Sequence, residues 1–481
     1  MTIGTSVPRF IHDLLDNAAG RWPEKVAIHD GNGAWTYAEL EFASRQYAAG
    51  LRAANVGAGD RVLISAFAER WVIAAIYACS RIGAVAVPLT PDLRPAQLQQ
   101  ITDDAEPALI LTGPPGPATG AVTTSPVSPD APTLFLYTSG STGLPKAVMC
   151  PHQQILFVAD AIAGRIGYRH DDVILCRLPL SFDYGLYQEF MAAAVGATVV
   201  LRGPGQDGGL IAAVQEHAVT VVPVVPSLAT VLIQLGRRGV SIGVRLVTNT
   251  GQELARVQLD GLRRTFPTAA VQLMYGITEC KRVSIADPDA DQDMPGSVGK
   301  ALSGTGVVIV DSHGRPILDG GEGQIVVRGP HLMSGYWRDD QLTAQTYRQN
   351  PATGERELHT GDYGHMDVQG NLYFHGRRDH LFKQRGVRTS VTEIEAAALQ
   401  IPQVSDAALI PPLGDREAVL FAVTTLDPKE VLQRLRERLE AAKVPAICRI
   451  LPSLPLGSTG KIDRGALRNQ LDENLGENLH V

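Results

Sequence analysis

A short stretch rich in hydroxyl side chains, with one lysine, is the first part of this 481-residue sequence that suggests chemistry. Its candidate residues are Thr138, Ser139, Gly140, Ser141, Thr142, Gly143 and Lys146. Hydroxyl groups, backbone N–H groups and an ammonium are suited to binding phosphate. The stretch is not a Walker A loop, because Lys146 does not directly follow Gly143 and Ala147 stands where that loop needs Ser or Thr for magnesium. It therefore predicts a phosphate loop of another kind, with magnesium held elsewhere.

Other residues that could do chemistry recur further along the chain. The stretch MYGITE ends at Glu279, and HTGD ends at Asp362. Arg377 precedes a basic, glycine-bearing turn that ends at Arg388, and Lys461 closes the glycine-rich turn LGSTGK. Each of these alone is typical of an ordinary turn or a solvated surface charge. Their order along one chain is what makes them a strong signal.

The surrounding elements predict the fold that positions these residues. Apolar runs at 61–65, 84–88, 197–201 and 220–225 read as strands, and 69–82 and 209–217 read as helices. Strands that alternate with helices imply βαβ units and mostly parallel sheets. Between residues 307 and 374, short strands broken by glycine turns predict antiparallel hairpins. The tail predicts a helix at 391–399, a strand near Ala407 and a helix at 428–442.

Composition narrows the class of protein. A net charge of −7 argues against a protein that coats nucleic acid. Five scattered cysteines without a C-x-x-C pair predict free thiols in a reducing compartment. The N-terminus does not resemble a signal peptide, and the apolar run at 71–80 is too short to span a membrane. We therefore expect a cytoplasmic α/β protein that binds neither nucleic acid nor membrane.

Taken in order, these motifs resemble the adenylate-forming superfamily, which comprises acyl-CoA synthetases, luciferases and nonribosomal peptide synthetase adenylation domains. The resemblance covers nearly the whole chain and includes WTYAEL at 35–40, RIGAVAVPL at 81–89 and the segment 323–337. Two departures are Ala147, where such proteins mostly carry glycine, and the order Glu322-Gly323-Gln324. Neither is expected to abolish function. The resemblance implies a core domain over residues 1–378, made of parallel α/β subdomains and a β-barrel-like subdomain. It also implies a small mobile α+β lid over 379–481.

The resemblance further implies a reaction with ATP. A substrate carboxylate would attack the α-phosphorus, pyrophosphate would leave, and an acyl-AMP would remain. Because both reactants are anionic, the site must supply positive charge and in-line positioning. Lys461 would bridge the carboxylate and the α-phosphate, Glu279 would bind Mg²⁺, and Thr278 would donate to the α-phosphate. Arg388 would face the phosphates.

The same resemblance assigns the nucleotide contacts. Asp362 would accept hydrogen bonds from the ribose, with Arg377 nearby. Tyr275 would stack on adenine next to Gly276. The hydroxyl-rich loop and Lys146 would grip the leaving phosphates. In a second pose of the lid, reached by a hinge at Asp379, Gly386 would let a phosphopantetheine arm pass close to the backbone.

The acid to be activated is suggested by Asp183, which lies where amino-acid-activating members carry an aspartate that pairs with the substrate ammonium. A buried carboxylate is costly unless it is paired, so two interpretations stay open. Asp183 binds a substrate amine, or it pairs internally with Arg282. Other residues expected along the pocket walls are Tyr184, Tyr187, Thr248, Thr250 and Met274.

Three functions therefore compete. The first is a free-standing ligase that activates a small acid, favoured as an amino acid, and loads a separate carrier protein. The second is an acyl-CoA ligase for a small acid. The third is a non-catalytic module that kept the fold, against which Lys461, Glu279 and Asp362 argue.

Overall fold

The computed structural model describes most of the chain, with gaps at several loops and at both ends. The described residues are 7–91, 93, 95–116, 127–139, 145–236, 243–377, 381–384, 387–412, 417–439, 441–457 and 462–476. The side chains of Ser139 and Arg388, within these ranges, are not described.

The largest sheet is mostly parallel. Its order is β14 (Lys300–Ala301), β13 (Ser284–Ile285), β12 (Ala270–Tyr275), β11 (Leu246–Asn249), β10 (Val221–Val224), β8 (Val173–Cys176), β9 (Thr198–Leu201), β1 (Val26–Asp30) and β2 (Gly33–Thr36). The strands from β12 to β1 pair in parallel, and β2, β13 and β14 add antiparallel edges. Every residue of β10 is buried, as expected for a parallel strand covered on both faces.

A second sheet carries the candidate phosphate loop. Its order is β17 (Gly335–Tyr336), β7 (Pro145–Pro151), β6 (Pro132–Ser139), β4 (Val85–Leu89), β3 (Arg61–Ser65) and β5 (Leu109–Leu111). The strands β3 to β6 are parallel, whereas β6 and β7 form an antiparallel hairpin. The loop 140–144 joins these two strands and lies outside the described residues.

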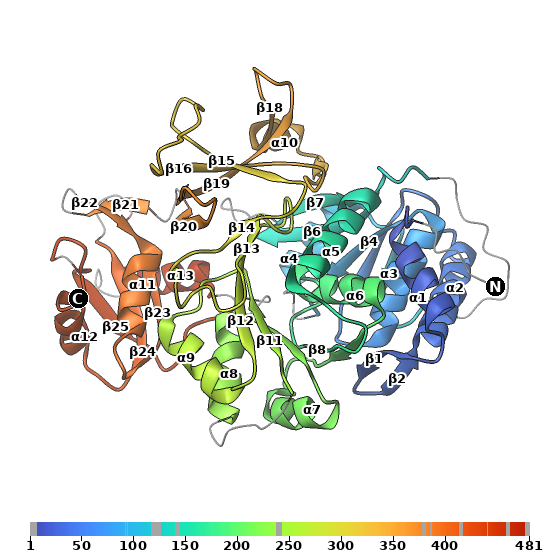
Figure 1. Ribbon diagram of the computed structural model, residues 1–481, viewed down its shortest axis with the longest axis horizontal. Coiled ribbons are helices and arrows are strands. Elements are labelled where there is room, and N and C mark those ends of the chain that lie inside the picture. The colour runs from blue at the N-terminus through green and yellow to red at the C-terminus, as the bar shows by residue number, and fades with distance from the viewer. Residues whose placement is uncertain are drawn as a thin grey trace.

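Helices pack around the two sheets (Figure 1). They are α1 (Ile11–Arg21), α2 (Tyr37–Ala53), α3 (Arg70–Ile82), α4 (Pro95–Ala105), α5 (His152–Ile166), α6 (Asp183–Val195), α7 (Leu210–Glu216), α8 (Pro226–Leu235) and α9 (Arg256–Thr265). The helix predicted at 69–82 is confirmed as α3, which is buried along almost its whole length. It ends at Gly83, whose φ of 75° is the left-handed conformation that favours glycine. Among the described residues, no helix combines the length and apolar character needed to cross a membrane.

An antiparallel sheet follows in the chain, as the glycine-rich turns predicted. It contains β15 (Gly306–Val310), β16 (Gly323–Arg328), β18 (Tyr347–Gln349), β19 (Arg356–Met366) and β20 (Leu372–Arg377), with α10 (Asp340–Thr346) beside it. Its pairs are all antiparallel in the described part of the chain.

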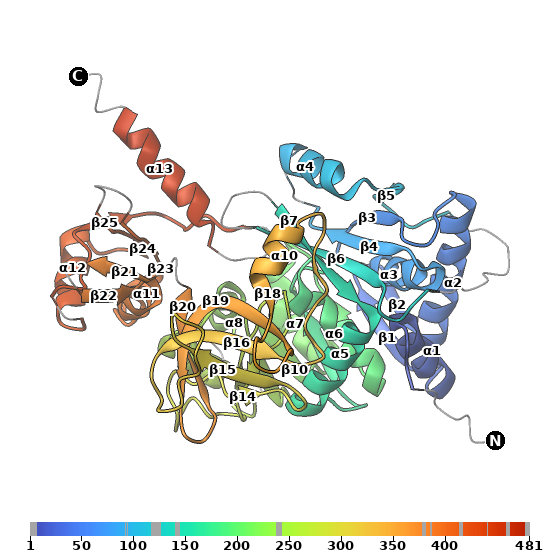
Figure 2. The same cartoon turned by 90° about the horizontal axis from the view of Figure 1, so that it is seen from above.

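The C-terminal part has a hydrophobic core of its own. It contains β21 (Leu381–Gln384), β22 (Val387–Ser390), α11 (Val391–Leu399), β23 (Val404–Ile410), β24 (Val419–Thr424), α12 (Pro428–Arg436), β25 (Ile447–Ile450) and α13 (Arg464–Gly476). Figures 1 and 2 both place it away from α1 and α2. The helix expected to reach residue 442 ends at Arg436, and the chain continues in a turn in which Arg438 N–H and Leu439 N–H bond to the Leu435 carbonyl at 3.0 and 2.9 Å. The expected boundary at 378 and 379 lies outside the described residues.

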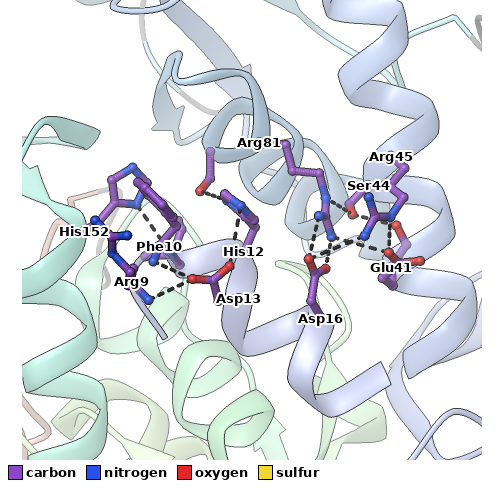
Figure 3. Close-up of polar contacts among 12 residues, drawn as sticks. Arg9, Phe10, His12, Asp13, Asp16, Glu41, Ser44, Arg45, Arg81 and His152 are labelled. Atoms are coloured by element: carbon purple, nitrogen blue, oxygen red, sulfur yellow. Dashed lines mark hydrogen bonds and ion pairs between the residues drawn. The ribbon is translucent and has the colours of Figure 1, made fainter. Parts of the chain in front are cut away.

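Buried polar side chains join α1 to its neighbours (Figure 3). His12 Nδ1 lies 2.8 Å from Ser80 Oγ of α3, and Arg81 is bonded to Asp16 on two nitrogens. His152 Nδ1, at the start of α5, accepts the Ile11 N–H at 3.2 Å. Burial is the largest cause that lowers the pKa of His12 to about 4 and of His152 to about 3. Both imidazoles are therefore neutral in the folded protein near pH 7.

Because these two histidines are neutral in the folded protein, we expect the protein to lose stability in mild acid. Below about pH 6.5 the unfolded chain binds protons that the two buried rings do not accept, so the free energy of unfolding should fall as the pH is lowered towards 4. His152→Asn, whose amide oxygen can replace Nδ1 as the acceptor, should remove about 3 kcal/mol of this dependence. Unfolding followed across this pH range checks it. The exposed His313→Asn is the control, and an unchanged slope in His152→Asn contradicts the explanation.

Candidate active site

A large cleft opens at the carboxyl ends of the parallel strands β11 and β12. It is lined there by Thr250 and Tyr275, by Lys146 of β7, and by Asp362 and Arg377 of the β19–β20 hairpin. C-terminal side chains such as Phe382 also line it. The carboxyl edge of such sheets is where ligands bind in open α/β folds. The structure thus brings together most of the predicted residues that it describes.

Asp362 and Arg377 are fixed opposite each other by the register of two strands. They are cross-strand partners in the β19–β20 pair, and Arg377 Nε donates to Asp362 Oδ1 at 3.1 Å. The Tyr275 hydroxyl donates to Oδ2 of the same carboxylate. Asp362 is 2% exposed, and burial is the main cause that raises its pKa, opposed by Arg377. The result is a rigid acceptor facing the cleft.

Tyr275 lies at the end of β12 with its ring already stacked on another side chain. Its ring centroid is 5.0 Å from that of Phe374, with an interplanar angle of 29°. An adenine that stacks on Tyr275, as the sequence predicts, would therefore lie beside a ring that already packs against Phe374.

A tight turn after β12 brings several predicted residues to the cleft. A Cβ on Gly276 would lie 2.2 Å from the Lys281 carbonyl oxygen, so the turn requires glycine there. Lys281 itself has a φ of 65°, in the left-handed region. The turn exposes Thr278 and Glu279 to the cleft and returns the chain so that Arg282 also lines it.

The hydroxyl-rich loop is described only at its two ends. Thr138 of β6 and Lys146 of β7 are cross-strand partners, and both line the cleft. Gly140, Ser141, Thr142 and Gly143 lie outside the described residues. So do Lys461, Asp379 and Gly386, and the side chains of Ser139 and Arg388. Their predicted roles stay predictions.

The carboxylate expected to hold a metal ion is Glu279. Tyr336 Oη donates to Glu279 Oε1 at 2.6 Å, and within the described ranges no other donor bonds to this carboxylate. Nowhere in those ranges do three or more His, Cys, Asp or Glu side chains gather around a metal site. A single carboxylate suits Mg²⁺, which keeps several waters and is shared with substrate phosphates. The residues present therefore fit a cation that arrives with a nucleotide.

The ion pair of Asp183 differs from the internal pair with Arg282 that the sequence suggested as one alternative. Lys281 Nζ, not Arg282, lies nearest to Asp183, at 3.9 Å from Oδ2. Arg282 instead donates to Thr250 Oγ1 and lies 5.5 Å from the Tyr184 ring centroid. The internal pairing of Asp183 with Arg282 is thus corrected, because the turn directs the two cations to different partners.

Two tyrosines expected on the pocket walls lie one layer deeper. Tyr184 and Tyr187 are each 3% exposed and do not line the cleft, and neither does Thr248, which is bonded to the Tyr184 hydroxyl at 2.7 Å. The Lys281 ammonium lies over the Tyr187 ring at 5.8 Å. The cations of the turn therefore form the wall that the tyrosines were expected to form. Thr250 and Met274 do line the cleft.

Three residues of the site were not assigned from the sequence. Lys281 directly precedes Arg282, and its position in the turn is the signal that could have found it. Tyr336 belongs to the quoted segment 323–337, but nothing in that segment indicates contact with Glu279. Phe374 lies in an apolar strand, and nothing else in the sequence indicates that it contacts Tyr275.

One cleft thus gathers the residues that the sequence predicts to contact a nucleotide and an acid. The family described as AMP-binding enzyme matches residues 15–124 and 114–337, and its C-terminal domain family matches 393–461. The chain therefore belongs to the AMP-binding enzyme family.

Three similar proteins place this chain within that family. An L-proline--[L-prolyl-carrier protein] ligase of Pseudomonas fluorescens is 28% identical, over 96% of this chain and 100% of its own. The structure of VinN, also solved in complex with L-aspartate, is 37–38% identical, with TM-scores of 0.69–0.70 over 76% of this chain and 98% of its own. The o-succinylbenzoate CoA synthetase of Bacillus subtilis, solved with its acyl-adenylate, is 25% identical, with a TM-score of 0.84 over 94% of this chain and 97% of its own. The predicted α/β fold and the family are confirmed, and the chain is an acid-activating ligase.

Asp362 yields a direct test of the nucleotide site. Asp362→Asn removes the charged acceptor, so the KM for ATP should rise at least about tenfold, which corresponds to about 1.4 kcal/mol for a charge-assisted hydrogen bond. ATP–pyrophosphate exchange measures this KM. Asp311→Asn, in an exposed turn of the same antiparallel sheet region, is the control. A KM within twofold of wild type would remove Asp362 from the site.

Proposed function

We propose that this enzyme activates an amino acid that carries a second carboxylate and then transfers it to the phosphopantetheine thiol of a separate carrier protein. A substrate carboxylate oxygen attacks the α-phosphorus of ATP, the bond from that phosphorus to the β-phosphate oxygen breaks, and pyrophosphate leaves. The thiol then displaces AMP from the mixed anhydride. The observation that supports this proposal most strongly is the burial of the Arg282 guanidinium in the cleft wall without an ion pair among the described residues.

Arg282 is a buried cation with no carboxylate within ion-pair distance among the described residues, and the charge of Asp183 acts on it only from farther away. It is 5% exposed, and among the described residues its Nε has no hydrogen-bond partner and its guanidinium forms no ion pair. Burial lowers its pKa, but arginine remains charged in proteins. A buried charge is expensive unless it is paired. Because Arg282 lines the cleft, a carboxylate of the substrate is the anion that would satisfy it.

Asp183 provides the complementary negative charge. Its side chain is 12% exposed at the start of α6, and it lines the same cleft. Lys281 lies 3.9 Å away, beyond hydrogen-bond distance, and donates instead to the Thr278 carbonyl at 2.8 Å. Asp183 therefore keeps acceptor capacity for a substrate ammonium. The reacting carboxylate must face the α-phosphorus of ATP, so a carboxylate at Arg282 would be a second one. Together with an ammonium at Asp183 it describes an acidic amino acid, and the complex of VinN with L-aspartate supports this class.

The nucleotide would occupy the other side of the cleft. Asp362, held by Arg377, would accept from the ribose hydroxyls, and the Tyr275–Phe374 pair would flank the base. Thr278 and Lys146 would meet the phosphates. Glu279 would hold Mg²⁺, which neutralises phosphate charge when bound. Lys461 and Arg388 would supply further positive charge from the lid, as the sequence predicts.

The acceptor thiol would come from a partner. The five cysteines are buried free thiols, which agrees with a reducing compartment and with a thiol supplied from outside. We place the enzyme in the cytoplasm. Burial raises the pKa of Cys280 well above its ordinary value, so this thiol, next to Glu279, remains a poor nucleophile.

Substrate choice tests the proposed function. Amino-acid-dependent exchange of labelled pyrophosphate into ATP should favour aspartate-type substrates over the matching amide or alanine by about 100-fold or more in kcat/KM, because the amide leaves Arg282 unpaired. Arg282→Gln should reduce this preference to below about tenfold, whereas the exposed Arg264→Gln should keep it. Equal use of the amide by wild type, or full selectivity in Arg282→Gln, contradicts the proposal. No exchange with any acid would favour a non-catalytic module.

The acceptor requires a separate experiment. With the preferred amino acid and ATP, a phosphopantetheinylated carrier protein should be acylated at least about tenfold faster than free CoA, because docking of the carrier raises the effective concentration of its thiol. Mass spectrometry of the carrier and chromatography of CoA esters measure the two rates. Faster acylation of CoA would identify an acyl-CoA ligase.

A further inference from the structure

The carboxylate of Glu279 is oriented by one phenol. Tyr336 is 7% exposed, and its hydroxyl lies 2.6 Å from Glu279 Oε1. A carboxylate oxygen can only accept a hydrogen bond, so the Tyr336 hydroxyl is the donor. Tyr336 bonds to Oε1 alone, so Oε2 has no donor among the described residues, and Glu279 lines the cleft.

Tyr336 is itself held by the sheet that carries the phosphate loop. Gly335 and Tyr336, as β17, pair with Met149 and Val148 of β7, the strand that leaves that loop. Tyr336 N–H also donates to Thr343 Oγ1 of α10 at 2.9 Å. Gly335 has a φ of 140°, and a Cβ there would lie 2.4 Å from Thr343 Cγ2, so glycine is needed for this contact. The position of the Tyr336 side chain therefore depends on the backbone of the β6–β7 hairpin, which carries the predicted phosphate loop.

The backbone of Glu279 is fixed independently of its carboxylate. Its carbonyl oxygen accepts from Met333 N–H at 2.9 Å and from the Tyr347 hydroxyl at 3.0 Å. Two tyrosines therefore contact the same residue, one at the carboxylate and one at the carbonyl. Tyr336 therefore acts on the orientation of the Glu279 side chain, whereas Tyr347 supports only its backbone.

We infer that Tyr336 is a positioning residue that holds the Glu279 carboxylate toward the cation of a metal–ATP complex and couples it to the phosphate hairpin. The inference rests on the proposed function. A free glutamate side chain would lose rotamer freedom when it binds a cation, and the hydrogen bond from Tyr336 removes that freedom beforehand. Partners that orient a metal ligand typically change metal affinity by about 10–100-fold.

Tyr336→Phe and Tyr347→Phe form a matched pair for the test. Each removes one buried hydroxyl from contact with Glu279, but only the first releases the carboxylate. The Mg²⁺ concentration for half-maximal pyrophosphate exchange at saturating ATP should rise about tenfold in Tyr336→Phe and less than about twofold in Tyr347→Phe. Binding of Mn²⁺ to the enzyme with a non-hydrolysable ATP analogue, followed by the electron paramagnetic resonance of free Mn²⁺, should show the same ratio without turnover.

A double-mutant cycle shows whether Tyr336 acts through Glu279. In a Glu279→Gln background, Tyr336→Phe should change Mn²⁺ affinity less than about twofold. Equal metal affinity in wild type and Tyr336→Phe, or an undiminished effect in the Glu279→Gln background, overturns the inference. Should Tyr336→Phe not fold, Thr343→Val, which removes the acceptor for Tyr336 N–H, replaces it with an expected rise of about threefold. Wild type that binds no Mn²⁺ with the analogue would refute the proposed function instead.

Discussion

The proposed substrate choice follows from one constraint: a guanidinium is buried in the wall of the cleft and forms no ion pair with any described carboxylate. Desolvating such a charge costs several kcal/mol unless an anion compensates it. Thr250 and the ring of Tyr184 supply only partial compensation to Arg282. The guanidinium therefore keeps unmet bonding capacity, which a substrate carboxylate would satisfy under the proposed function. Asp183 lines the same cleft with the opposite charge, so under the proposed function the two side chains would bind the ammonium and the second carboxylate of the substrate.

The rest of the site depends on contacts between segments far apart in the chain. The register of β19 and β20 places Arg377 against Asp362, and the tight turn after β12 presents Glu279 and Arg282 from one short segment. The two-residue strand β17 connects that turn to the phosphate hairpin through Tyr336. One short turn therefore carries both Glu279, expected to face the nucleotide, and Arg282, expected to face the acid. The geometry of this turn depends on Gly276.

The sequence predicted the parts of this arrangement that are local. Alternating strands and helices gave the mostly parallel sheets, and contiguous motifs gave Glu279, Asp362 and Arg377. It could not rank depth within α6, so Tyr184 and Tyr187 were expected at the wall that Lys281 and Arg282 occupy. Of the two interpretations of Asp183 that the sequence left open, the internal pairing named Arg282, whereas Lys281 is the nearer cation. The Tyr336–Glu279 contact was missed, since it exists only once β17 pairs with β7.

The most direct measurement of the central claim is a crystal structure of the enzyme with a non-hydrolysable sulfamoyl analogue of an aspartyl adenylate. The account predicts that the second carboxylate of the analogue is hydrogen-bonded to the Arg282 guanidinium, with the ammonium at Asp183. A structure in which Arg282 contacts only protein atoms while that carboxylate faces solvent would contradict it.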